Sequence, residues 1–139
     1  MVAALDTNHF TELVRASSFG QHLRFRLKER QVSAFITVVN AQEIDEGWCA
    51  LINKQPEGRQ VKAYAQFQHS LELMMELHLL PFDGASAALF HQLQPSFRHI
   101  GTMDLKIAAI CVTHDTLLLN RNLADFEKVP GLRVENWLD

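Results

Sequence analysis

The sequence predicts an α/β fold, a three-layer α/β/α sandwich around a mostly parallel sheet of about five strands. Short apolar and β-branched runs alternate along the chain with longer segments whose apolar residues recur at helical spacing. This alternation favours parallel strands, because each right-handed crossover returns the chain through a helix packed on one face of the sheet. The length of 139 residues suits a single domain covering residues 1–139.

The N-terminal part begins with a predicted strand, Val2–Leu5, that ends at Asp6. Thr7 and Asn8 are both residue types that cap helices, so the chain is expected to enter a helix at this point. A second helix is predicted from Phe19 to Arg30. Its basic residues form either a solvated face or a small edge that contacts phosphate. These residues are Arg24, Arg26, Lys28 and Arg30.

The clearest strand is Ala34–Val39, a nearly continuous β-branched and aromatic run typical of a strand buried on both faces. Asn40 follows this run, and Glu43 stands three residues later, which is the spacing of a capping box at a helix start. Glu43 is therefore either a capping residue or a site residue. The helix after it is expected to continue through Ile52 and to stop at the breaker segment 54–58.

The middle of the chain holds a long amphipathic helix, predicted from Arg59 to Leu77, whose apolar stripe indicates a core or an interface. A short strand follows at Leu79–Phe82. Pro81 cannot donate to a strand ladder, so this strand is expected at a sheet edge or near a strand end. Asp83 is expected to cap a helix over Ala85–Leu93.

The segment Ile100–Ala109 places an acid, Asp104, near the start of an otherwise apolar helix. Gly101 and Thr102 are plausible first residues of that helix, so Asp104 falls in its first turn. The unpaired N–H groups and the helix dipole favour negative charge there, which explains the acid without a function. A shared site gains weight because other acids also stand where a predicted strand gives way to a helix.

The C-terminal part is predicted to add a buried strand, Thr116–Leu119, and a last strand over Leu132–Trp137. Between these strands lie the polar turn Asn120–Asn122 and a loop or short helical turn that holds Asp125. The turn Asn120–Asn122 follows a strand directly, so its side chains are expected at the carboxyl edge of the sheet.

Three acids are expected at this carboxyl edge, where parallel sheets bind ligands: Asp6, Glu43 and Asp104. Clustered carboxylates repel one another unless a cation neutralises them. An oxygen-only set without Cys or His suits Mg²⁺ or Mn²⁺. Such ions polarise a phosphodiester and activate water, so the predicted chemistry is metal-dependent phosphodiester hydrolysis.

Composition argues against several other classes of protein. The net charge of −3 disfavours a nucleic-acid binder held by basic surface alone. Cys49 and Cys111 form neither a CxxC pair nor a disulfide framework, and no HxxxH pairing supports a zinc site. No apolar run reaches membrane-spanning length, and Met1–Leu5 is too short for a signal peptide. The expectation is a cytoplasmic protein without a membrane partner.

Four motifs, in order and correctly separated, resemble those of the PIN-domain ribonucleases, and most closely the VapC-type toxins of bacterial toxin–antitoxin pairs. The likeness extends over nearly the whole chain. The motifs are Leu5-Asp6-Thr7-Asn8, Glu43 with Gly47, Gly101 through Ala109, and Asn122 with Asp125-Phe126 and Pro130-Gly131-Leu132.

The resemblance implies a PIN-like fold, metal-dependent endoribonuclease activity on an RNA substrate, a homodimer, and inhibition by a cognate antitoxin protein inserted near the site. It implies that Asp6, Glu43 and Asp104 bind Mg²⁺ or Mn²⁺ and that Asn122 completes the catalytic set. Residues adjacent to the site are then Thr7, Asn8, Asn120 and Asp125.

The fourth motif departs from the family pattern. Asn120 stands where the family usually has Thr or Ser, and Asn122 stands where some members carry a further acid. An amide binds a cation more weakly than a carboxylate does, so a second metal is less well supported than the first. Asp125 either contributes through water or caps the turn.

Two other functions compete with this interpretation. A PIN-like fold kept as a binding module needs no acid triad, and metal-dependent hydrolysis of added nucleic acid separates it from a nuclease. A phosphotransfer domain with a phosphorylated Asp6 also uses an acid at a strand end. The chain lacks the second acid beside Asp6, and the later lysine, that such a domain needs.

Overall fold

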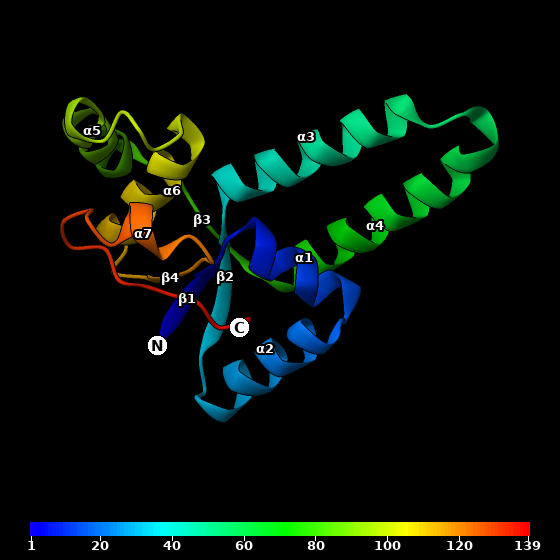
Figure 1. The fold of residues 1–139 in the computed structure, drawn as a ribbon, viewed down its shortest axis with the longest axis horizontal. Coiled ribbons are helices and arrows are strands. Elements are labelled where there is room, and N and C mark those ends of the chain that lie inside the picture. Colours follow the sequence, from blue (N-terminus) through cyan, green and yellow to red (C-terminus); the bar gives the residue numbers. More distant parts are fainter.

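The computed structural model describes residues 1–139 and contains one five-stranded sheet (Figure 1). The strands are β1 (Val2–Leu5), β2 (Ser33–Thr37), β3 (His78–Leu80), β4 (Leu117–Leu119) and β5 (Val134–Glu135). Their order is β3-β2-β1-β4-β5, and every neighbouring pair is parallel. The predicted α/β fold class is confirmed, with a sheet that is entirely parallel.

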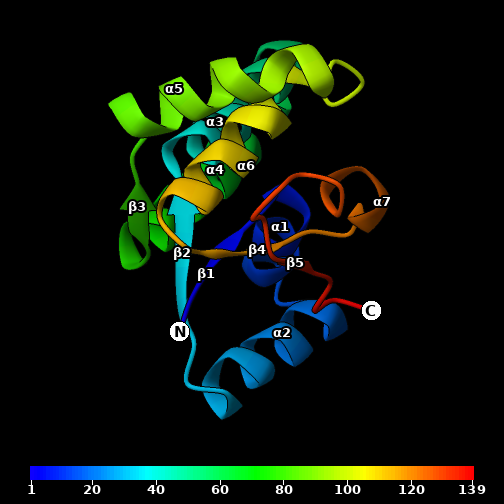
Figure 2. The same cartoon turned by 90° about the vertical axis from the view of Figure 1, so that its left-hand side faces the viewer.

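Helices cover both faces of this sheet (Figure 2). The α-helices are α1 (Thr7–Arg15), α2 (Ser18–Glu29), α3 (Val38–Lys54), α4 (Gln60–Glu76), α5 (Gly84–Leu93), α6 (Thr102–Thr113) and α7 (Leu123–Phe126). Single 3₁₀ turns are η1 (Glu57–Arg59) and η2 (Gln94–Ser96). Helices α5 and α6 pack on one face, and α1 and α2 pack on the other. None of these helices combines the length and apolar character needed to cross a membrane.

Two hydrophobic cores lie on opposite faces of the central strands. Along β1, Ala4 belongs to the core under α5 and α6, whereas Leu5 belongs to the core under α1 and α2. Along β4, Leu118 and Leu119 divide in the same way, and the register pairs Ala4 with Leu118. Burial on both faces explains why these strands are continuous apolar runs in the sequence. Each buried leucine contributes roughly 1.5–3 kcal/mol, so the two cores hold β1 firmly in place.

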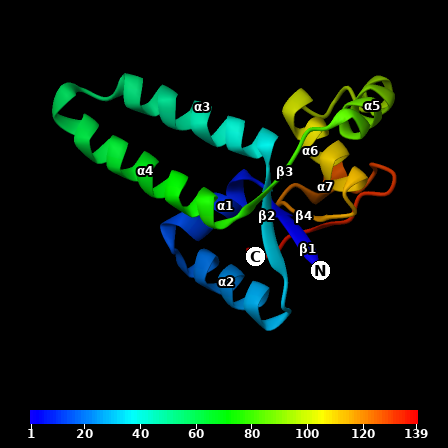
Figure 3. The ribbon, with the colours of Figure 1, turned by 180° about the vertical axis from the view of Figure 1, so that it is seen from behind.

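The α3–α4 pair forms a long hairpin that projects from the sheet, away from α5 and α6 (Figure 3). The hairpin exposes several large apolar side chains. Those on α4 are Val61, Tyr64 and Met75.

The predicted capping box at the start of α3 is wrong. Strand β2 ends at Thr37 rather than at Val39, and the box is formed by Thr37 and Asn40 instead of Asn40 and Glu43. The Asn40 N–H donates to Thr37 Oγ1 (3.0 Å), and the Thr37 N–H donates to Asn40 Oδ1 (3.4 Å). Because the helix starts three residues earlier than predicted, Glu43 lies beyond its first turn and has no capping role.

Other boundaries differ by smaller amounts. Helix α1 begins at Thr7 after Asp6, so neither Thr7 nor Asn8 is its N-cap residue. The last strand covers Val134–Glu135 instead of Leu132–Trp137. It ends early because the Trp137 N–H leaves the sheet and donates to Nε2 of the buried His9 (3.1 Å).

The crossing of α1 and α2 depends on Gly20, where an added Cβ would overlap the backbone carbonyl of Glu12. We expect Gly20→Ala to lower the free energy of unfolding by roughly 1–3 kcal/mol, because two backbones must separate. Gly47 on α3 has open space around it, so Gly47→Ala should raise stability by up to about 1 kcal/mol through helix propensity alone. Urea unfolding measures both changes. A Gly20→Ala protein as stable as the parent would mean that the crossing relaxes freely.

Candidate metal centre

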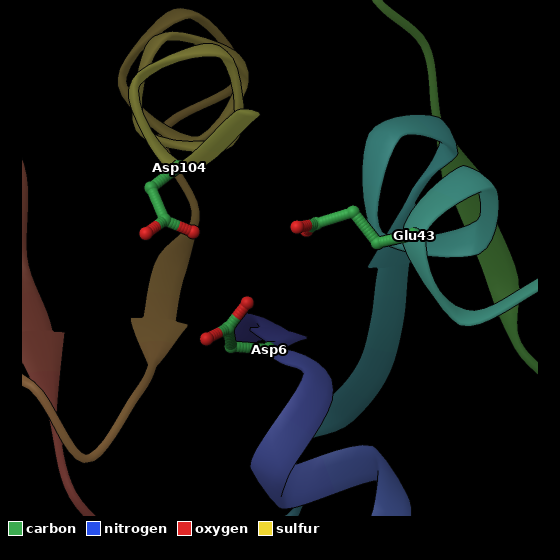
Figure 4. A group of neighbouring side chains, drawn as sticks. All are labelled: Asp6, Glu43 and Asp104. Atoms are coloured by element: carbon green, nitrogen blue, oxygen red, sulfur yellow. The ribbon is translucent and has the colours of Figure 1, made fainter. Parts of the chain in front are cut away.

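Three acids from three separate elements converge beyond the carboxyl end of β1. Asp6 directly follows β1, Glu43 lies in α3, and Asp104 lies in the first turn of α6. One carboxylate oxygen from each acid lies within 4.8 Å of the others. Figure 4 shows the three side chains pointing toward a common space. The structure therefore brings together the three acids that the sequence analysis singled out.

Asp6 is the most buried of the three acids, with only 9% of its surface exposed. Its backbone N–H donates to the Leu119 carbonyl (3.0 Å), which anchors it between β1 and β4. Asn40 Nδ2 donates to Asp6 Oδ1 (2.9 Å), and Asn120 Nδ2 donates to Asp6 Oδ2 (2.6 Å). Both carboxylate oxygens of Asp6 are therefore hydrogen bonded.

Glu43 and Asp104 receive no such support. Neither carboxylate accepts a hydrogen bond from another residue, and Glu43 Oε1 is buried without a partner. A buried oxygen without a donor is costly, and a bound cation is one way to satisfy it.

The electrostatics of the cluster raise the pKa values of all three acids. Burial raises the pKa of Asp6 to about 6, and the neighbouring Asp104 adds to the rise. Burial, followed by Asp104 and Asp6, raises the pKa of Glu43 to about 7. Burial and then Asp125 raise the pKa of Asp104. Negative charge is thus concentrated in a site with few protein donors, as in many cation sites.

The polar residues of the fourth motif differ in how they contact the three acids. Asn120 contacts Asp6 directly, as described above. Asn122 is exposed, and its Nδ2 donates to Asp125 Oδ2 (2.8 Å). Asp125 lies close enough to Asp104 to raise the pKa of that acid.

Among the residues beside Asp6, Thr7 is half-buried and lines the same pocket as Glu43, whereas Asn8 is exposed. Asn40 is the site residue that sequence analysis missed, because its spacing to Glu43 suggested a helix cap. Its position directly after a central parallel strand is the signal that points to the site.

The donor set fits a hard divalent cation. All three side chains offer carboxylate oxygens, and none offers the nitrogen or sulfur that zinc favours. Three ionised acids supply more negative charge than the neighbouring amides offset. Asp6, Glu43 and Asp104 thus form an acidic group that could hold a divalent cation.

An apolar groove of about 570 Å³ lies between α1, α3 and α4. Phe10, Trp48 and Leu51 line it, with Arg15 and Lys62 among its polar residues. A smaller pocket shares Trp48 and Leu51 with this groove and extends to Thr7 and Glu43. The groove therefore adjoins a pocket that contains Glu43, one of the three acids.

Comparisons with known proteins show the fold. No protein-family model and no curated protein matches the chain. Among solved structures, VapBC2 from Rickettsia felis bound to a promoter DNA fragment aligns with a TM-score of 0.76 at 18% identity, covering 99% of each chain. VapBC-1 from nontypeable Haemophilus influenzae aligns over 100% of both chains, with a TM-score of 0.75 and 16% identity.

FitAcB from Neisseria gonorrhoeae aligns with a TM-score of 0.73 at 21% identity, covering 98% of this chain and 97% of that one. These likenesses span essentially the whole chain, and they confirm the predicted PIN-like fold.

The raised pKa values predict how the stability of the metal-free protein depends on pH. Protonation favours the folded state, because Asp6 and Glu43 have ordinary values of 3.8 and 4.5 and folded-state values of about 6 and about 7. This stabilisation is complete below the ordinary values and is lost as pH rises through the folded-state values.

We therefore expect the free energy of unfolding to fall between about pH 4 and pH 7 more steeply in the parent than in Asp6→Asn/Glu43→Gln/Asp104→Asn. Urea titrations at several pH values in the presence of a chelator measure this difference. Identical pH profiles would show that the three acids titrate normally.

Proposed function

We propose that this protein is a VapC-type toxin that cleaves RNA phosphodiester bonds as a Mg²⁺- or Mn²⁺-dependent endoribonuclease. The observation that carries the proposal is the convergence of Asp6, Glu43 and Asp104 within 4.8 Å at the carboxyl edge of the sheet. The PIN-like fold, shared with structures of toxin–antitoxin complexes, supports it. A binding module would need no such concentration of unsupported acids.

The side chains have distinct parts in this proposal. A bound divalent cation polarises the phosphodiester and lowers the pKa of water. Asp6 and Asp104 would hold the cation, with the Asp6 carboxylate oriented by its two amide donors. Glu43 also contributes an oxygen. Asn122 donates a hydrogen bond to Asp125, whose charge contributes to the raised pKa of Asp104.

The first test of this function uses conservative replacements of two acids. Asp104→Asn and Glu43→Gln each remove a charge at nearly constant volume, so both should remain folded. We expect each to lower RNA cleavage by about a hundredfold or more, the scale typical of a lost transition-state contact. Both should also lose the rise in melting temperature that Mg²⁺ or Mn²⁺ gives the parent.

Near-normal cleavage by both variants would refute the site. Metal-induced stabilisation of a parent that cleaves no RNA would favour the binding module instead. Glu43→Gln is informative on its own, since the capping box at Thr37 and Asn40 does not involve Glu43.

We further propose that a cognate antitoxin protein occupies the groove between α1, α3 and α4. The groove is largely apolar, like the buried core of a protein–protein interface, and a smaller pocket beside it contains Thr7 and Glu43, so a bound chain could also cover Glu43. Several solved structures with this fold are toxin–antitoxin complexes. A second copy of this chain is a further proposed partner, which the exposed apolar residues of α4 would suit.

The groove is tested by a matched pair of charge substitutions on exposed apolar residues. Leu51→Glu places a charge inside the groove, and Phe25→Glu places one outside it, on α2. We expect Leu51→Glu to weaken binding of the proposed cognate antitoxin by about tenfold or more, because the bound protein would remove that charge from water. Phe25→Glu should bind normally. Equal affinities, measured by titration calorimetry, would place the antitoxin elsewhere.

A further inference from the structure

Two buried asparagine side chains donate hydrogen bonds to the carboxylate of Asp6, one to each oxygen. Asn40 comes from the start of α3, directly after β2, and Asn120 directly follows β4. These two strands flank β1 in the sheet. Asn40 is fully buried and Asn120 is 3% exposed, and each donates to a different oxygen of Asp6, at 2.9 and 2.6 Å.

The orientation of each amide is set by its own neighbours. An Asn side chain can turn either its NH₂ group or its oxygen toward an acid, and only the NH₂ group attracts a carboxylate. Asn40 Oδ1 accepts from the Thr37 hydroxyl (2.7 Å) and lies 3.4 Å from the Thr37 N–H that donates to it. Asn120 Oδ1 accepts from the Asn122 N–H (2.6 Å). Since a backbone N–H can only donate, both amide oxygens are committed and both NH₂ groups face Asp6.

We propose that Asn40 and Asn120 are positioning residues that hold the Asp6 carboxylate, before any cation arrives, in the orientation in which it binds one. This inference rests on the proposed metal centre, and it adds two residues that orient one of the metal-binding acids. Each oxygen of Asp6 accepts one asparagine N–H, and a carboxylate oxygen has more than one lone pair, so these bonds do not exclude a cation.

The other two acids show why this matters. Glu43 and Asp104 accept no hydrogen bonds, so their carboxylates are free to adjust to a ligand. Asp6 is the only one of the three acids whose carboxylate is oriented by side-chain hydrogen bonds. A metal-coordinating side chain that is already oriented loses less conformational entropy when the cation binds. Removing residues that hydrogen bond to such a side chain typically weakens metal affinity by about 10- to 100-fold.

The test measures Mn²⁺ affinity by calorimetry on metal-free protein, at a pH above the titration of the acids. We expect Asn40→Ala and Asn120→Ala each to raise the dissociation constant by roughly 10- to 100-fold. Asp6→Asn provides the reference for loss of the ligand itself. Circular dichroism establishes that each variant is folded, and Asn120→Ala decides the question if Asn40→Ala does not fold.

The matched control separates positioning from helix capping. Ser17 caps α2 by accepting from the Gly20 N–H (3.1 Å), so Ser17→Ala loses a capping hydrogen bond as Asn40→Ala does, but at a helix that carries none of the three acids. It should lose stability and keep its Mn²⁺ affinity. Unchanged Mn²⁺ affinity in folded Asn40→Ala and Asn120→Ala would overturn the positioning role while leaving the metal centre intact. A parent that binds no Mn²⁺ would overturn the metal centre, and this inference with it.

Discussion

The burial of the Asp6 carboxylate is the constraint on which the site depends. Removing a carboxylate from water is unfavourable unless donors or a cation replace the lost hydration. Here the sheet itself supplies two donors, because β2 and β4 flank β1 and each is followed by an asparagine that reaches Asp6. The donors offset only part of the desolvation, and the pKa of Asp6 remains raised to about 6. The part of the desolvation cost that the donors do not offset would be relieved by a bound cation, which is why the site suits one.

The two cores make this arrangement rigid. Residues of β1 and β4 are buried on both faces, so Asp6 and Asn120 leave the sheet from positions that packing determines. Glu43 and Asp104 come instead from helices α3 and α6, which contribute side chains to the same two cores. Like charges held this close lower the stability of the metal-free protein. The fold thus accepts a local cost at the position where the proposed chemistry needs negative charge.

The apolar groove adjoins the metal centre through a smaller pocket that contains Glu43. Glu43 and Trp48 lie on the same helix, and the pocket that contains both opens into the larger apolar groove beside α4. A chain bound in that groove could therefore extend to Glu43. In the proposed function, this geometry would let a bound antitoxin also cover part of the metal centre.

The sequence by itself determined the alternation of strands and helices, and with it the convergence of Asp6, Glu43 and Asp104, because parallel strands must end at one edge. It left the start of α3 ambiguous, since Thr37 to Asn40 and Asn40 to Glu43 have the same capping spacing. Only the tertiary structure resolved that choice, by placing Asn40 against an acid 34 residues away in the chain. Local patterns cannot reveal such a contact, because its energy depends on which distant groups packing brings together.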